Sequence, residues 1–295
     1  MTDKSRSSAR SHKGARRDAN YLPQSIANAF EDDLVRLISV LDHSFGRKGS
    51  YLQAEFKSKY LDPEQVSPDD RKSAAIEKWR QAESVNCRTN QRLLVGDADF
   101  GWCTSDQLIR TARQFIANCL GPVRYPDVVC GEAYTNGAST SVKRSPIAAV
   151  EKLTGQVHVS SSAIKHWLQR AKGTRLADQV IVVDDNSVLF TVPKKTEIDR
   201  VACKEPHGNQ LLQRSIGVYI RKRLRRCGID LSDQTVNQRL AANALSRGLA
   251  TIDLSSASDT ISRQLVLTLL PFDWWSLLDD CRVKTAIIEG EPHEL

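Results

Sequence analysis

The segment from Leu249 to Ser262 contains the side chains of this sequence that are best suited to chemistry. Asp253 ends a short apolar run, and Asp259 follows a turn of small residues. The run has the composition of a short, largely buried strand, and the serines after it suit a close approach of backbone to a ligand or the start of a helix. A carboxylate at the end of such a strand needs a partner. Mg²⁺ with bound phosphates would provide one, because this ion prefers carboxylate and phosphate oxygens.

A structural explanation competes with the metal site. Ser256 and Asp259 have the S-x-x-D spacing of a capping-box variant, which would leave Asp253 as a strand-end residue in a turn. Spacing alone favours the structural explanation, because isolated short motifs often match by chance. The neighbouring sequence therefore has to decide between the two.

A strongly basic segment precedes the two aspartates. It runs from Lys194 to Arg226 and holds ten basic residues against three acidic ones, a surplus as large as the formal net charge of +7 of the whole chain. Lys194, Arg200 and Lys204 lie on an extended, Pro-interrupted stretch where folding does not require charge. These three are the leading candidates for binding triphosphate oxygens.

Other cations have a structural explanation beside a functional one. Residues 221–226 crowd the last turns of a predicted helix, where positive charge suits the helix dipole. Arg221 and Arg225 in this group are also candidates for RNA contacts. Lys143 and Arg144 end a polar, Gly- and Ser-containing loop and are candidates of the same kind, with a plain surface loop as the alternative.

Three blocks of the sequence resemble motifs of one enzyme family. Residues 252–262 closely resemble motif A of the RNA-directed RNA polymerases of small single-stranded RNA phages, the Qbeta-type replicase catalytic subunit. Residues 228–239 are similar to the block that precedes motif A in that family, and residues 192–206 are similar to its basic fingers motif, motif F. The family order of the blocks makes the resemblance specific, and it is clearest over residues 188–275.

The resemblance implies an α+β, right-hand polymerase fold of which this sequence holds the fingers and an incomplete palm. The expected organisation is a disordered basic arm (residues 1–20), a fingers-type region with an RNA and nucleotide channel (21–245) and the start of a palm with motif A (246–295). The implied activity is RNA-templated RNA synthesis by two-metal nucleotidyl transfer. A non-catalytic basic RNA-binding protein is the alternative, whereas a phosphate loop of the G-x-x-x-x-G-K-[ST] type does not occur in the sequence.

The resemblance also implies a role for each candidate residue. Asp253 and the backbone carbonyl of Leu254 would bind the catalytic metals, two Mg²⁺ ions with Mn²⁺ as a substitute. Ser258 and Asp259 would lie at the sugar of the incoming nucleotide, where a carboxylate can accept a hydrogen bond from the ribose 2′-OH. The motif F cations would neutralise the triphosphate. The family completes its metal site with a Gly-Asp-Asp hairpin, which these 295 residues lack, so we expect this chain alone to make no RNA.

Composition agrees with an anionic partner and argues against a membrane protein. The positive net charge favours nucleic acid. No apolar run approaches the roughly 20 residues needed to span a bilayer, and the seven cysteines form no C-x-x-C pair. Implied partners are RNA template and product, nucleoside triphosphates, host elongation factors Tu and Ts and a ribosomal protein, in the cytoplasm of a bacterial host.

Periodicity predicts the elements that position these residues. Helices are expected over residues 23–61, 68–86, 104–120, 159–176, 212–224 and 261–270. A β-hairpin is expected over residues 180–192, with Asp184 and Asp185 as its turn, and a buried strand over residues 249–254.

Overall fold

The computed structural model of the chain describes residues 33, 36, 40, 46–59, 66–95, 98–125, 127–250, 252 and 254–295. The predicted basic arm, most of the first predicted helix and Asp253 lie outside the described residues. The chain divides into two units, residues 1–61 and 62–295. In the first unit the structure contains helix α2 (Gly46–Lys59), and all that follows concerns the second unit.

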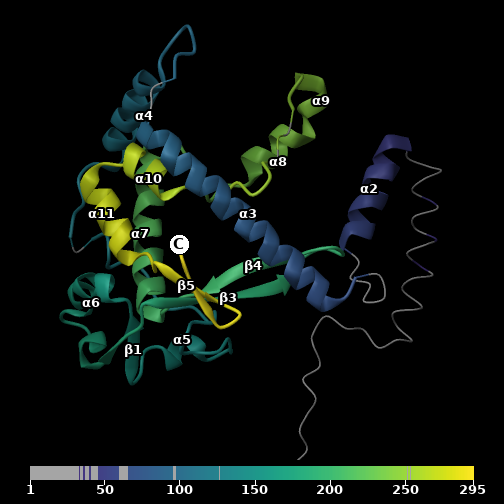
Figure 1. The fold of residues 1–295 in the computed structure, drawn as a ribbon. Helices are drawn as coiled ribbons and strands as arrows, with labels where there is room; N and C mark the ends of the chain where they lie inside the picture. Colours follow the sequence, from purple (N-terminus) through teal and green to yellow (C-terminus); the bar gives the residue numbers. More distant parts are fainter. Residues whose placement is uncertain are drawn as a thin grey trace, which may run out of the picture. The chain divides into compact units, whose positions relative to one another are not determined.

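Helices are the main elements of the second unit, and the strands form two small sheets, in agreement with an α+β chain (Figure 1). Helices are found where they were predicted over residues 68–86, 104–120, 212–224 and 261–270, since their apolar spacing is local to each segment, although the first continues to Val95. The helix predicted over residues 159–176 is wrong at both ends, because Val159 ends a strand and the α-helix covers only Ile164–Ala171. The helices are α3 (Pro68–Val95), α4 (Ser105–Leu120), α5 (Ala148–Glu151), α6 (Ile164–Ala171), α7 (His207–Arg226), α8 (Thr235–Ala242), α9 (Ala244–Arg247), α10 (Arg263–Leu269) and α11 (Phe272–Cys281), with short 3₁₀ turns at Ser161–Ala163 and Arg175–Asp178.

The two sheets overturn the predicted hairpin. Strand β2 (Val180–Val183) pairs in parallel with β1 (Gln156–Val159), whereas β3 (Asn186–Pro193) belongs to the other sheet, of order β4-β3-β5-β6. The remaining strands are β4 (Asp199–Lys204), β5 (Thr285–Ile288) and β6 (Glu291–Glu294). β3 is antiparallel to β4 and parallel to β5.

Asp184 and Asp185 separate β2 from β3, but they do not close a tight turn. The carboxylate of Asp184 accepts a hydrogen bond from Thr140 Oγ1 at 2.6 Å, and that of Asp185 accepts one from the Ser161 backbone at 2.7 Å. Both side chains therefore bind loops from elsewhere in the chain, and the two strands leave the pair of aspartates toward different sheets.

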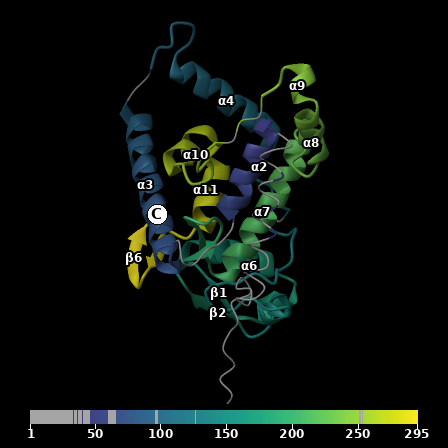
Figure 2. The same ribbon diagram turned by 90° about the vertical axis from the view of Figure 1, so that its right-hand side faces the viewer.

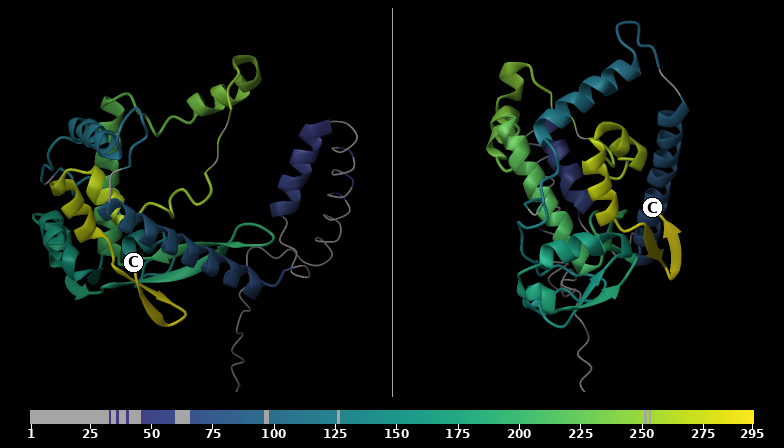
Figure 3. Two further views of the ribbon diagram at one scale, coloured as in Figure 1. Left: turned by 45° about the horizontal axis from the view of Figure 1, so that its top comes forward. Right: turned by 90° about the vertical axis from the view of Figure 1, so that its left-hand side faces the viewer.

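Helix α7 lies at the centre of the larger apolar core. Leu211, Leu212 and Ile216 on α7 are at most 1% exposed and pack in one cluster with Trp167 and Trp274. Gly208 allows the start of α7 to approach β1 closely, since an added Cβ would lie 2.9 Å from the carbonyl oxygen of His158. A smaller cluster lies between α3 and the four-stranded sheet, and Figures 2 and 3 show α3 passing along that sheet beside β6.

The predicted strand over residues 249–254 is wrong for the part of it that the structure describes. Leu249, Ile252 and Leu254 are 41%, 82% and 69% exposed and belong to no strand. The burial on which the prediction depended is therefore not found. The alternative capping box is not found either, because α10 begins after Ser262, whose Oγ accepts from the Leu265 backbone, while Ser256 lies in a turn at a φ of 53°.

In the part of the chain that the structure describes, none of the helices combines the length and the apolar character that a bilayer crossing requires.

Candidate functional site

The β3–β4 hairpin presents two of the predicted cations on one face. Side chains alternate along a strand, so Asp199 and Val201 point to one face of β4 and Arg200 and Lys204 to the other. The first face is covered by α3, where Asp199 forms a buried ion pair with Arg71 at 3.4 Å and Val201 packs in the smaller core cluster. Arg200 and Lys204 therefore occupy the face that α3 leaves uncovered.

We call this uncovered surface the open face; it consists of Val188, Phe190, Val192, Arg200 and Lys204. The register pairs Lys204 with Val188 and Arg200 with Val192, and the two valines are 38% and 37% exposed. The ammonium of Lys204 lies 4.8 Å from the centre of the Phe190 ring, a cation–π contact. The open face thus combines positive charge with apolar surface. Such a face suits a ligand that has both an anionic group and a flat apolar part.

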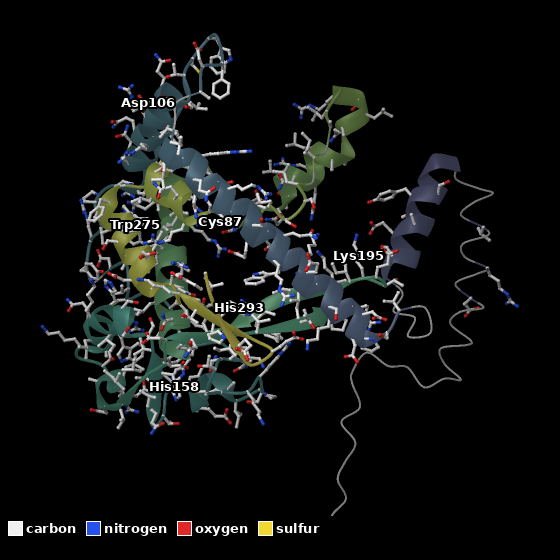
Figure 4. The ribbon with its side chains drawn as sticks, in the orientation of Figure 1. Cys87, Asp106, His158, Lys195, Trp275 and His293 are labelled. Atoms are coloured by element: carbon white, nitrogen blue, oxygen red, sulfur yellow. The ribbon has the colours of Figure 1, made fainter. Side chains whose placement is uncertain are left out.

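Lys194 lies at the tip of the same hairpin and is exposed. Its neighbour Lys195 donates its backbone N–H to the Ile198 carbonyl and is labelled at the tip in Figure 4. The turn therefore holds Lys194 close to the strand that carries Arg200, and the three predicted motif F cations are on one hairpin.

The polar loop with Lys143 and Arg144 is anchored rather than loose. Lys152, 1% exposed, donates to the carbonyls of Thr135 and Gly137 at 3.0 and 2.7 Å, and its burial lowers the pKa of its ammonium. No carboxylate among the described residues pairs with Lys152, and a buried charge without such a partner is costly, so its hydrogen bonds to the loop are needed.

The same loop lies against the end of β4. The Thr140 backbone donates to the Glu205 carbonyl at 3.1 Å, next to Lys204, and Gln210 Nε2 on α7 donates to the Ala138 carbonyl at 3.0 Å. Lys143 and Arg144 are exposed on this loop. The loop that carries the predicted cations is therefore bonded, at Thr140, to the residue that follows Lys204.

A buried histidine at the start of α7 contacts the same loop. His207 is 1% exposed, and its Nδ1 lies 2.9 Å from Ser141 Oγ. Burial first and the neighbouring His158 second lower the pKa of His207 to about 4, so its ring is neutral at pH 7. His207 therefore joins the loop to the start of α7 without adding charge.

Asp259 and Ser258 lie at a second location, against α3. Both are exposed, Ser258 Oγ donates to Asp259 Oδ1 at 3.1 Å, and the backbone carbonyl of Asp259 accepts from Asn86 Nδ2 at 2.9 Å. The charge of Asp259 contributes to a raised pKa of Glu83, after the larger effect of burial. The carboxylate of Asp259 therefore faces solvent while its backbone is held.

Among the described residues, no hydrogen bond or ion pair joins Asp259 to Lys194, Arg200 or Lys204. Figure 4 labels Lys195 at the hairpin tip and Cys87, the neighbour of Asn86, on α3, well apart from each other. The predicted triphosphate cations and the predicted sugar contact are thus separate here. Asp253 is outside the described residues, and those described include no cluster of three His, Cys, Asp or Glu side chains placed to hold a metal.

The arginines at the end of α7 are partly structural. Arg225 forms an ion pair with Asp230 at 3.0 Å, and Arg223 donates to the Cys119 carbonyl at the end of α4. Arg221 is exposed. The structural explanation of this cluster therefore holds for Arg223 and Arg225.

Sequence reasoning missed Lys152, His207 and Asn86. Each acts through contacts with residues distant in the sequence, and none stands in a local pattern that would single it out. A lysine next to the apolar run Ala148–Val150 was the one available signal, for Lys152.

Comparison with known proteins gives one consistent family. The model of the RNA replicase beta-chain family matches residues 32–295. The chain is 37% identical over 257 residues to the RNA-directed RNA polymerase beta chain of Escherichia phage MS2, an alignment covering 82% of this chain and 46% of that protein. It is 38% identical to that of Enterobacteria phage fr (75% and 42% covered) and 35% identical to the beta subunit of Escherichia virus Qbeta (79% and 40%).

The chain thus spans less than half the length of these relatives. Because the family model matches nearly all of the chain, and the blocks that resemble motifs F and A lie inside the match, the chain belongs to the RNA replicase beta-chain family.

Proposed function

We propose that these residues form the fingers and the first part of the palm of a right-hand RNA-directed RNA polymerase that replicates a phage RNA genome. The observation that carries the proposal is the match of the family model over residues 32–295. The relatives named above are RNA-directed RNA polymerase beta chains, which supports this activity for a polymerase that carries these residues.

In this proposal Asp253 and the Leu254 carbonyl contribute oxygen ligands to the catalytic metals. An oxygen-only donor set suits Mg²⁺, with Mn²⁺ as a substitute, and Leu254 is well exposed. The ions would lower the pKa of the attacking 3′-hydroxyl and stabilise the leaving oxygens. One carboxylate does not complete such a site, and these 295 residues contain no Gly-Asp-Asp, so the proposal includes that they make no RNA by themselves.

The open face and the Asp259 segment would serve the incoming nucleotide. Arg200, Lys204 and Lys194 would neutralise the triphosphate and stabilise charge on the leaving pyrophosphate. Ser258 and Asp259 would contact the ribose. Since no direct bond joins these two groups among the described residues, a bound nucleotide would bridge them, with its phosphates at the cations and its sugar at Asp259.

The proposed partners follow from the family. They are RNA template and product, nucleoside triphosphates, and, in a replicase holoenzyme in the bacterial cytoplasm, elongation factors Tu and Ts with a ribosomal protein. Lys143, Arg144, Arg221 and Arg225 are proposed RNA contacts, and the first two are supported by the bond that joins their loop, at Thr140, to the residue after Lys204.

Asp253→Asn tests the proposal in a complete polymerase that carries these residues. We expect RNA synthesis to fall by at least about 1,000-fold, because the variant loses a negative metal ligand at the reacting phosphate, while RNA affinity is kept. Template-directed incorporation and RNA binding are measured on the same preparation. The control is Asp127→Asn, which removes an exposed carboxylate outside the proposed site.

If the complete protein binds RNA but incorporates no nucleotide even with Asp253 intact, the alternative of a non-catalytic RNA-binding protein is correct. If Asp253→Asn retains full synthesis, Asp253 is not a metal ligand.

A further inference from the structure

Two asparagines of α3 hold the segment that carries Asp259. Asn86 Nδ2 donates to the Asp259 carbonyl at 2.9 Å, and Asn90 Oδ1 accepts from the Gln264 backbone at 2.9 Å. Residues four apart lie on the same side of a helix, so one face of α3 contacts both ends of the stretch from Asp259 to Gln264.

The stretch between these contacts is otherwise ordered by its own short-range bonds. The Thr260 backbone donates to the Ser256 carbonyl at 3.1 Å, and Ser262, 1% exposed, caps α10. Arg263 adds a two-bond ion pair with Asp279 of α11, at 2.9 and 3.1 Å. The C-terminal end of the stretch is thus held by several contacts, but at Asp259 itself the long-range backbone contact is Asn86.

The amide of Asn86 is suited to this contact because of its surroundings. A backbone carbonyl can only accept, so Asn86 must present its NH₂ group there, and the same group lies 3.5 Å from Glu83 Oε1. Asn86 therefore bonds both Glu83 and the backbone of Asp259, two residues whose negative charges repel each other. An acid at position 86 would add a third negative group.

We propose that Asn86, supported by Asn90, is a positioning residue that fixes the backbone of Asp259 on α3 and thereby sets how its carboxylate meets the sugar of an incoming nucleotide. The inference rests on the proposed function, because it assigns α3 a part in choosing ribonucleotides over deoxyribonucleotides. Asn86 itself does not touch the nucleotide. It acts through Asp259, whose side chain is left exposed and directed to solvent.

The first experiment tests positioning on the 295-residue chain. Asn86→Asp replaces the donor by an acceptor of the same shape, and Asn86→Ala removes the donor without adding charge. Amide hydrogen exchange over residues 255–262 should become faster by roughly 2- to 10-fold in both, the equivalent of one lost hydrogen bond. Gln81→Glu is the matched control, since Gln81 is on the same helix and bonds only to Glu77 at 3.2 Å among its recorded partners.

The second experiment tests selection in a complete polymerase that carries these residues. The ratio of kcat/KM for a ribonucleotide to that for the matching deoxyribonucleotide is measured for wild type, Asn86→Asp, Asn86→Ala, Gln81→Glu and Asp259→Ala. We expect both Asn86 variants to lower the ratio by about 3- to 10-fold and Gln81→Glu to leave it unchanged. A purely structural role would lower both rates together and leave the ratio intact.

The outcomes separate the inference from the proposed function. Unchanged hydrogen exchange in both Asn86 variants overturns the inference. Faster exchange with an unchanged ratio also overturns it if Asp259→Ala lowers the ratio, and the role of Asp259 then stands. If Asp259→Ala leaves the ratio of an active polymerase unchanged, the proposed contact of Asp259 with ribose is wrong, and the inference fails with it.

Discussion

At the residue scale, buried polar side chains hold the loops that carry the exposed cations. Lys152 and His207 are each 1% exposed, and both bind the loop next to Lys204. Burial lowers the pKa of both side chains, and that of His207 falls to about 4, so the His207 ring adds no charge at pH 7. The exposed cations of the loop and of β4 are the ones available to a ligand.

His207 makes the stability of the chain dependent on pH. Its pKa is about 4 when folded against 6.5 when unfolded, so between these values the unfolded state binds more protons. The stabilisation is therefore present above pH 6.5 and is lost as the pH falls toward 4, by roughly 3 kcal/mol at most. Urea unfolding of wild type and His207→Gln at pH 7 and pH 4.5 measures it. The variant should lose less free energy of unfolding on acidification than wild type, and equal losses in both would contradict the prediction.

At the element scale, the sequence predicts the elements that depend on local contacts and fails for those that depend on distant ones. α3, α4 and α10 follow from the spacing of apolar residues within each segment. The strand pairing does not follow from local spacing. A connection that contains α6 separates β2 from its partner β1, and β5, which pairs with β3, begins only at Thr285. The apolar runs at Val180 and Val188 read as neighbours in a hairpin, although their partners lie elsewhere.

The same distinction between local and distant contacts applies to the residues of the candidate site. The motif F cations were predicted from charge on an extended stretch, and the alternation that places Arg200 and Lys204 on one face of β4 is local. Asn86 was not found, because its role depends on a carbonyl 173 residues later in the chain. The strand expected at Leu249 was wrong because apolar composition does not supply a pairing partner, and its described leucines and isoleucine are exposed.

Two glycines of α7 test the packing of this helix on β1, since one lies at the contact and the other does not. Gly208→Ala would place a Cβ 2.9 Å from the His158 carbonyl and 3.0 Å from Val159 Cβ, so backbone would have to shift, and we expect a loss of about 1–3 kcal/mol in the free energy of unfolding. Gly217→Ala on the same helix meets nothing within 4 Å and should instead stabilise by roughly 0.5–1 kcal/mol. Chemical denaturation of both variants measures the difference. A neutral Gly208→Ala would contradict the close approach of α7 to β1.

At the scale of the second unit, the cations are divided between those that hold the fold and those that are free to bind. Arg71 is buried in an ion pair with Asp199, and Arg223 bonds the end of α4. Arg200 and Lys204 have no ion pair recorded among the described residues and share the open face with exposed valines. Arg200 and Lys204 are therefore available to meet a phosphate on the face of the sheet opposite α3.

Removing charge from the open face should weaken nucleotide binding more than removing equal charge elsewhere. Arg200→Ala combined with Lys204→Ala is expected to lower the affinity for a nucleoside triphosphate by about 10-fold, because charge-assisted hydrogen bonds to phosphate are among the stronger polar contacts. The control pair is Lys172→Ala with Arg175→Ala, two exposed cations of the β1–β2 connection. Binding of a fluorescent triphosphate is measured at two salt concentrations. Salt screens contacts between charges, so the affinity of a variant that has lost such contacts should depend less on salt. Equal losses in the two double variants would mean that net charge alone, and not the open face, attracts the nucleotide.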